Sequence, residues 1–186
     1  MRIYAIRHGL TGLNKRGVLN GEIDEPLAPE GKEQARQAAK KLPGSIRHIY
    51  ASSQKRALQT AELLALPLAL PVNRHPSLVE IRLGSLRGHA WEDLPDGARL
   101  KDLHRTVRFD YTAFGGESVQ AVITRLTNFI RSIEHAHADD EVLLVTHGGI
   151  MRVLHFLESG EAVYDTRENL SLLPLDTAKI LGRQAG

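Results

Sequence analysis

Two His-Gly pairs, His8-Gly9 and His147-Gly148, each come at the end of a short apolar run, and Arg7 precedes the first pair. An arginine keeps its charge, and its planar fork donates hydrogen bonds in pairs to phosphate oxygens. A neutral imidazole can attack phosphorus and carry the phosphoryl group, which divides one difficult step into two easier ones. These residue types therefore point to chemistry on a phosphate group, provided that the fold brings the two histidines together.

Strand-like and helix-like patterns alternate along the chain. Short apolar runs predict strands over Met1–Ile6, Ile46–Ala51, Pro71–Arg74, Glu141–Thr146 and Asn169–Leu175. Apolar residues at helical spacing predict helices over Pro29–Leu42, Ser53–Leu66, Ser118–Ala136 and Gly149–Leu157. This alternation predicts an α/β fold, a three-layer sandwich in which a mostly parallel central sheet carries helices on both faces.

Four predicted strands end next to residues with useful chemistry. Arg7 and His8 follow the first, Arg56 follows the second, Glu80 the third and His147 the fourth. Because ligands of open α/β sheets bind beyond the carboxyl ends of the strands, we expect these side chains to share one rim. Each has a plain structural alternative when taken alone, such as a solvated charge or a hydrogen-bonded core histidine. Their joint placement favours a site.

Bulk properties narrow the class of protein. The 186 residues predict a single domain, 1–186, in which residues 84–116 break the alternation and form a short insertion covering the site. A net charge of +2 does not support a nucleic-acid-binding surface, and the absence of cysteine excludes disulfides and thiolate catalysis. No apolar run is long enough to cross a membrane, so a cytoplasmic protein is the default expectation.

These motifs, in this order, resemble the histidine phosphatase superfamily, also called the phosphoglycerate-mutase-like family. The resemblance runs from residue 1 to about residue 155 and rests on Arg7-His8-Gly9 with Thr11 and Asn14; Gly21, Asp24, Pro26-Leu27, Gly31 and Gln34-Ala35; Ser52-Ser53, Arg56-Ala57 and Thr60-Ala61; Leu78, Glu80 and Gly84; Gly116-Glu117-Ser118; and Val145-Thr146-His147-Gly148-Gly149.

The resemblance implies a role for each matching residue. His8 would be the phosphorylated nucleophile, and Glu80 the proton donor and then the base. Arg7, Asn14, Arg56 and His147 would bind the phosphate, with His147 also counted as catalytic. The family works without a metal or organic cofactor, so none is expected at this site. His8 needs a neighbour that fixes its tautomer, and the sequence does not identify that neighbour.

Two positions depart from the family pattern. Leu10 stands where Glu or Gln is common, and it could alter the pocket wall. Ala28 stands where Ser or Thr is common, so the helix that begins at Pro29 loses a side-chain cap.

The expected activity is hydrolysis of a small phosphate ester through a phosphohistidine. Mutases of the family are usually longer, and their extra length covers the site and excludes water, whereas the short segment 84–116 favours transfer to water. The pattern also resembles the α-ribazole phosphatase-like and broad-specificity phosphatase branches, which it does not separate. A phosphoglycerate mutase-type transfer and a non-catalytic phospho-ligand-binding module are the alternatives. The oligomeric state stays open, with a homodimer as one option.

Substrate choice is expected to depend on the segment around the insertion, because it is basic. Its members are Arg82, Arg87, His89, Arg99, Lys101, His104, Arg105 and Arg108. They form either a solvated surface or a second anion site for a multiply charged substrate. In the second case, Arg87→Ala or Arg105→Ala would raise KM for such substrates more than for a neutral aryl phosphate.

Overall fold

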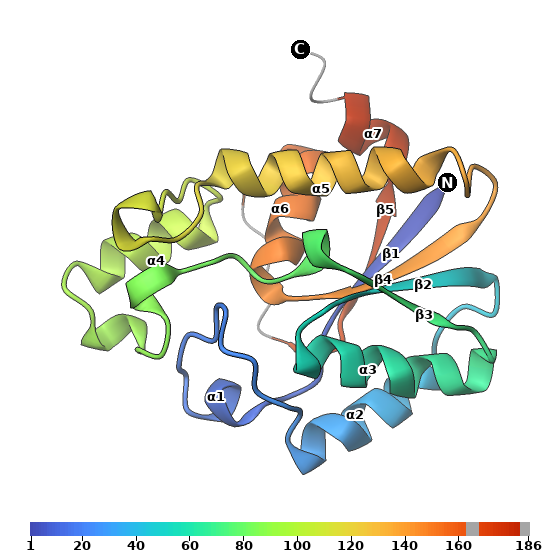
Figure 1. Ribbon diagram of the computed structural model, residues 1–186, viewed down its shortest axis with the longest axis horizontal. Coiled ribbons are helices and arrows are strands. Elements are labelled where there is room, and N and C mark those ends of the chain that lie inside the picture. The colour runs from blue at the N-terminus through green and yellow to red at the C-terminus, as the bar shows by residue number, and fades with distance from the viewer. Residues whose placement is uncertain (163–167, 183–186) are drawn as a thin grey trace.

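A sheet in the order β3-β2-β4-β1-β5 lies at the centre of the computed structural model, which describes residues 1–162 and 168–182 (Figure 1). Its strands are β1 (Arg2–Arg7), β2 (Ile46–Ser52), β3 (Val72–His75), β4 (Glu141–Thr146) and β5 (Leu172–Asp176). β1, β2, β3 and β4 run parallel, and β5 pairs antiparallel with β1 at one edge. The predicted mostly parallel sheet is confirmed. The last strand begins three residues later than predicted and contains Pro174, which suits an edge position.

Helices cover both faces of the sheet, as predicted. In Figure 1, α2 (Pro29–Ala39) and α3 (Lys55–Ala65) lie on one side, and α5 (Val119–Glu134) and α6 (Gly148–Ser159) lie on the other. Side chains alternate along β1, so Ile3 and Ala5 pack towards α5 and α6 while Ile6 packs towards α2 and α3. Two apolar cores, one on each face, hold the three layers together.

Local chemistry sets the ends of these helices. Ser118 caps α5 by accepting a hydrogen bond from the amide of Ala121, as its position suggested. α2 has no side-chain cap at Ala28 and begins with Pro29, whose fixed φ suits the first helical position. It ends at Ala39 rather than at the predicted Leu42, and the amide of Lys41 donates to the Ala38 carbonyl in a closing turn before Pro43. α6 ends on Gly160 in the left-handed conformation.

Short elements escaped the sequence prediction. α1 (Gly12–Lys15) lies within the loop that follows β1, α4 (Gly97–Arg105) within the segment 84–116, and α7 (Thr177–Gly182) after β5. The structure also has short 3₁₀ turns: η1 (Leu66–Leu68), η2 (Pro76–Leu78), η3 (Gly84–Leu86), η4 (Trp91–Asp93) and η5 (Thr112–Phe114). α4 buries only Gly97 and Leu100, so its sequence carries little periodic signal. Within residues 1–162 and 168–182, no helix is long and apolar enough to cross a bilayer.

The strand order positions the residues of interest. β4 lies between β1 and β2, and the register pairs Arg7 with Thr146 and Ala51 with Val145. The three strands therefore end at the same level, so the residues that follow them meet at one edge of the sheet.

Candidate active site

A pocket of about 390 Å³ opens at the carboxyl ends of these strands. Five of the six predicted site residues line it: Arg7, His8, Asn14, Arg56 and Glu80. The sixth, His147, is fully buried directly behind His8, with the two ring centroids 5.1 Å apart and the rings edge to face. The structure therefore brings all six together, five on the wall and one beneath it.

The ring of His8 is held in one tautomer. Its Nδ1 atom lies 2.7 Å from the carbonyl oxygen of Gly9, and a carbonyl can only accept, so Nδ1 carries the proton. Nε2 therefore keeps its lone pair, and Arg56 Nε donates to it at 3.3 Å. Burial lowers the pKa of His8 well below its usual value, and the guanidinium groups of Arg56 and Arg7 lower it further. The ring is thus neutral, with Nε2 as its basic atom.

The backbone around His8 is fixed from three sides. The amide of His8 donates to the Thr146 carbonyl, and its own carbonyl accepts from the side chain of Asn169. The amide of Gly9 donates to the hydroxyl of Thr60 on α3. These bonds keep the imidazole in place without a side-chain partner on Nδ1.

A tight approach of two backbones explains the glycines near this turn. A Cβ at Gly9 would stand 2.5 Å from the carbonyl oxygen of Gly31, and one at Gly31 would stand 2.1 Å from that of Leu10. Neither contact is tolerable, so the loop after β1 can lie against the start of α2 only because both positions lack a side chain.

Arg56 is a fully buried arginine in the first turn of α3. Its Nη1 donates to the carbonyl of Ile23 at 2.6 Å and its Nη2 to that of Gly21 at 3.0 Å. Asp24 on the same loop accepts from the amide of Lys55, which caps a helix that lacks a side-chain cap of its own. These hydrogen bonds therefore fix the loop after β1 and the start of α3 relative to one another.

His147 is oriented by Ser52, at the end of β2. Its Nε2 lies 2.8 Å from the Ser52 hydroxyl, whereas its buried Nδ1 has no hydrogen-bond partner. Burial lowers the pKa of His147 well below its usual value, and Arg56 and His8 lower it further. A neutral ring that accepts the hydroxyl proton at Nε2 carries its own proton on Nδ1, which is then a donor held ready for a ligand.

Asn14 and Arg7 complete the cationic and polar wall. Asn14 lies in α1, the short helix that Thr11 caps by accepting from the amide of Asn14. Its Oδ1 is buried without a hydrogen-bond partner. Arg7 ends β1, and burial lowers its pKa while the Glu80 carboxylate opposes that effect. A guanidinium stays charged despite such a shift.

Glu80 lies on an irregular segment between β3 and residue 84. Its two carboxylate oxygens accept from the amides of Ile81 at 2.9 Å and Gly149 at 3.2 Å. A Cβ at Gly149 would stand 2.6 Å from Oε1, so the carboxylate occupies space that only a glycine leaves open. The carboxyl group is therefore aimed at the pocket by the first turn of α6.

Side chains from three other elements hold this segment. Arg125 of α5 donates to the carbonyls of Ser77 and Val79 and pairs with the buried Glu117, which in turn accepts from the amide of Arg82. Thr146 of β4 donates to the Leu78 carbonyl, so the polar end of that buried strand has the partner it needs. The third holder is Gln54, whose Oε1 accepts from the amide of Glu80 and whose Nε2 donates to the Gly21 carbonyl.

The sequence did not single out several residues of the pocket. These are Gln54, which orients the site from behind, and the wall residues Trp91, Arg152 and Asn169. Gln54 and Arg152 carry no local signal, because one is a polar residue before a helix and the other an arginine on an apolar helix. Asn169 lies far along the chain and reaches the site only because β5 returns beside β1.

The basic insertion is mostly turned away from the pocket. Of its eight basic residues only His104 lines the wall. Burial lowers the pKa of His104 to about 3, so the ring is neutral. Arg99, Lys101, Arg105 and Arg108 form exposed ion pairs with nearby acids of the same segment, Asp96, Glu92 and Asp102. In the described part of the chain, a third arginine lines the pocket in addition to Arg7 and Arg56, namely Arg152 of α6.

Among the residues that the structure describes, the pocket combines three guanidinium groups, one carboxylate and neutral imidazoles. Such a lining attracts a dianion, offers it paired donors, and presents a nucleophilic nitrogen and a proton donor. The described residues that lie close enough to share a metal ion, His48, His137 and Asp140, are at the opposite end of the sheet.

Comparisons with known proteins agree with this geometry. The model of the histidine phosphatase superfamily (branch 1) matches residues 3–169. Phosphoglycerate mutase-like protein 4 of Arabidopsis thaliana is 31% identical over 82% of this chain and 69% of its own length. The metal-independent phosphoserine phosphatase of the same plant is 32% identical over 82% of this chain and 66% of its own length, just under two thirds. The mycobacterial glucosyl-3-phosphoglycerate phosphatase Rv2419c, solved with VO3, superposes with a TM-score of 0.80 at 26% identity, covering 94% of this chain and 90% of that one.

Proposed function

The chain belongs to branch 1 of the histidine phosphatase superfamily, and from that premise we propose that it hydrolyses small phosphate monoesters through a phosphohistidine on His8. The observation that carries the proposal is the tautomer of His8, whose Gly9 contact leaves Nε2 as the basic atom in a wall of guanidinium groups. A buried neutral imidazole with its lone pair towards an anion pocket is what attack on phosphorus requires.

The reaction proceeds in two balanced steps. In the first, His8 Nε2 forms a bond to phosphorus as the ester P–O bond breaks, and the Glu80 carboxyl gives its proton to the leaving oxygen. In the second, Glu80 takes a proton from water, the oxygen bonds to phosphorus, and the P–N bond breaks, which restores His8 and releases phosphate. Arg7, Arg56, Asn14 and the Nδ1–H of His147 stabilise the oxygens of the transferring group throughout.

We favour transfer of the phosphoryl group to water over its return to the substrate, because the segment that covers the site, residues 84–116, is short. We propose that residues 84–116 are an insertion within one domain, 1–186, and that Trp91 and His104 are its contribution to the pocket wall. A wall of this size leaves water access to phosphohistidine, which a mutase must prevent.

A mutase-type transfer is the second candidate, and Arg152 is the observation that favours it. This third guanidinium lines the pocket, and its charge acts on both Arg7 and His104. It could hold the carboxylate or second phosphate of a phosphoglycerate. Several relatives are named mutases or mutase-like proteins, in agreement with this alternative.

The test is hydrolysis of p-nitrophenyl phosphate in the presence of EDTA. Wild-type protein should turn over and should form a phosphoenzyme that survives alkaline quenching and is lost in acid, as a phosphoramidate does. His8→Ala should abolish both, whereas His89→Ala, an exposed histidine outside the pocket wall, should change neither. Turnover by His8→Ala at the wild-type rate would refute the nucleophile.

Two further assays separate the alternatives. Formation of 2-phosphoglycerate from 3-phosphoglycerate and a bisphosphate primer, faster than hydrolysis, would replace the phosphatase with a mutase. A protein that binds inorganic phosphate but turns over no member of a broad phosphomonoester panel would instead be a binding module.

A further inference from the structure

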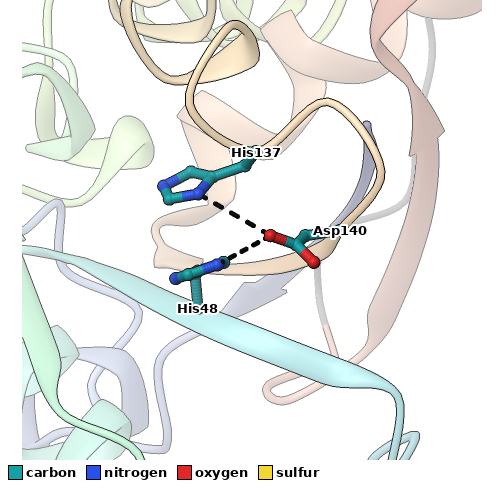
Figure 2. A group of neighbouring side chains, drawn as sticks. All are labelled: His48, His137 and Asp140. Carbon is teal, nitrogen blue, oxygen red and sulfur yellow. Dashed lines mark hydrogen bonds and ion pairs between the residues drawn. The ribbon is translucent and has the colours of Figure 1, made fainter.

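Two histidines and an aspartate meet at the end of the sheet opposite the pocket. Figure 2 shows His48, on β2, and His137, in the turn between α5 and β4, both directed at Asp140, the residue before β4. His48 Nε2 lies 3.0 Å from Asp140 Oδ2, and His137 Nδ1 lies 3.9 Å from the same oxygen. One ligand atom from each of the three residues lies within 4.8 Å of the other two.

These separations are close to those of a metal site. Zinc binds imidazole nitrogen and carboxylate oxygen at about 2.0–2.2 Å, so two of its tetrahedral ligands stand roughly 3.3–3.5 Å apart. The observed contacts of 3.0 and 3.9 Å bracket that spacing, and small rotations of the side chains would equalise them. Two imidazoles with one carboxylate suit a divalent transition metal rather than Mg²⁺ or Ca²⁺, which prefer oxygen ligands only.

A further contact orients one ligand. The Tyr50 hydroxyl, also on β2, lies 2.9 Å from Nε2 of His137, the nitrogen that faces away from Asp140. Histidines that bind metals usually donate their second ring N–H to such a partner, which fixes the tautomer and leaves the other nitrogen free to coordinate. With Nε2–H donated to Tyr50, His137 presents its Nδ1 lone pair to the site.

The turn that carries two of the ligands is itself well fixed. The amide of Asp140 donates to the His137 carbonyl, and the Asp140 carbonyl accepts from the amide of Arg2 at the start of β1. The rings of His48 and His137 are stacked, with centroids 3.7 Å apart and planes 27° from parallel. The ligands are therefore held close together before any ion arrives, which lowers the entropy lost on binding.

An ion can reach this position from solvent. All three side chains are partly exposed, and Asp140 lines a hollow of about 660 Å³ whose wall also carries Asp139, Glu141 and Asp176. That hollow is larger than the active-site pocket at the carboxyl ends of the strands. Among the described residues, its wall carries four carboxylates, Asp140 included, against one guanidinium group, that of Arg2, and this excess of negative charge attracts a cation.

We propose that His48, His137 and Asp140 bind one divalent transition-metal ion, best fitted by Zn²⁺, with water completing its coordination. The ion ties β2 to the turn before β4 and stabilises the folded chain by mass action. The length of β4 separates it from His147 by roughly 20 Å, so it takes no part in phosphoryl transfer. The site is independent of the proposed hydrolase activity.

The experiment uses the full chain after chelator treatment and dialysis. Isothermal titration with ZnCl2 should show one saturable site, and the melting temperature should rise with Zn²⁺ and not with Mg²⁺. Co²⁺ as a second probe should give visible absorption bands of a nitrogen- and oxygen-ligated ion. His48→Gln and Asp140→Asn should each weaken Zn²⁺ binding by about tenfold or more and abolish the gain in melting temperature.

Matched variants make the outcome decisive. His135→Gln, an exposed neighbour on the same turn, should keep full affinity. His8→Ala should also keep it, which separates this site from adventitious binding in the phosphate pocket. The melting temperature of every variant without metal reports folding. Any of three results would overturn the proposal: no saturable site, unchanged Zn²⁺ affinity in both His48→Gln and Asp140→Asn, or loss of Zn²⁺ binding in His8→Ala. The cluster would then be an ordinary His–Asp ion pair.

Discussion

The backbone amide of Glu80 donates a 2.9 Å hydrogen bond to the side-chain oxygen of Gln54, whose nitrogen donates to the Gly21 carbonyl. Because Arg56 binds that same carbonyl, one glutamine connects the loop that holds the proposed phosphate-binding arginine to the segment that carries the proposed acid. Gln54 lies outside the lining of the pocket, so we regard it as a positioning residue.

Gln54→Leu should lower kcat for alkyl phosphates by about tenfold, because a lost buried hydrogen bond is worth roughly 1–3 kcal/mol and here aims the acid. The loss should be smaller for aryl phosphates, whose leaving groups need little protonation. Gln37→Leu, on the exposed face of α2, is the matched control and should leave both rates unchanged. An equal loss on both substrate classes would indicate a purely structural role for Gln54.

Glu80→Gln removes the acid while keeping the shape of the side chain. The rate should fall by about 100-fold or more on alkyl phosphates and much less on p-nitrophenyl phosphate, since general acid catalysis contributes roughly 10²–10⁴-fold where the leaving group is poor. Plotting log kcat/KM against leaving-group pKa should give a steeper slope for the variant than for wild type. Parallel lines would contradict the acid role.

Gly149→Ala places a methyl group where the Glu80 carboxylate lies, at 2.6 Å from Oε1. The added Cβ would also stand 2.7 Å from Cδ1 of the buried Ile81, which opposes the gain of about 1 kcal/mol that alanine brings to a helix. The variant should lose activity on alkyl phosphates, and its melting temperature, measured beside the rate, should show that it remains folded. Gly182→Ala in α7, where an added Cβ meets nothing within 4 Å, is the control for helix propensity and should keep full activity. A fully active Gly149→Ala would show that the carboxylate position is not critical.

His104, a half-buried histidine of the pocket wall, should make the fold sensitive to acid. Burial lowers the pKa of His104 to about 3, below its usual value near 6.5, so between these values the unfolded chain binds a proton that the folded chain does not. Stability is therefore complete above pH 6.5 and falls as the pH decreases. The free energy of unfolding, measured in urea, should fall less steeply with decreasing pH in His104→Gln than in wild type. The difference in slope should be at most about 1.4 kcal/mol per pH unit.

The exposed His89 serves as the control for this titration. His89→Gln should leave the pH dependence of unfolding as it is in wild type. If His104→Gln and wild type lost stability in parallel from pH 6.5 to pH 4, protonation of His104 would not contribute to acid sensitivity.

Variants of Arg152 and Arg105 test whether a second anionic group of the substrate binds inside the pocket or at the basic surface of the segment 84–116. Arg152→Met should raise KM for phosphoglycerates and other doubly charged esters by roughly tenfold, with little change for p-nitrophenyl phosphate. Arg105→Met should affect neither, because Arg105 is exposed and pairs with Asp102. This reverses the expectation drawn from the basic segment alone. An effect of Arg105 and none of Arg152 would restore it.

The sequence predicted the layers of the fold because they depend on strong local patterns, and the strand ends predicted that five of the six candidate residues would lie near one another, while Asn14 was named only from the family resemblance. Continuous apolar strands such as Glu141–Thr146 and the stripe of α5 leave little choice of structure. The residues that follow those strands then meet at one edge for topological reasons.

What the sequence did not predict depends on backbone geometry and on contacts between distant segments. The tautomer of His8 follows from the carbonyl of the next residue, Gly9, and the sequence does not show that the backbone turns this carbonyl towards Nδ1. Gln54, Arg125 and Asn169 act through backbone atoms of other elements, and a backbone carbonyl leaves no mark in the sequence. α4 was missed because a helix that buries so few residues has hardly any period.

The position of β4 has a consequence for how the chain is made. β4 lies between β1 and β2, yet it leaves the ribosome long after both, and β5, the other neighbour of β1, emerges later still. Until residues 141–146 are synthesised, β1 has no strand of this sheet beside it, and its open edge is exposed to other chains. Arg7 and His8 are thus made more than 130 residues before β4, and the site they belong to cannot form until residues 141–146 have been synthesised.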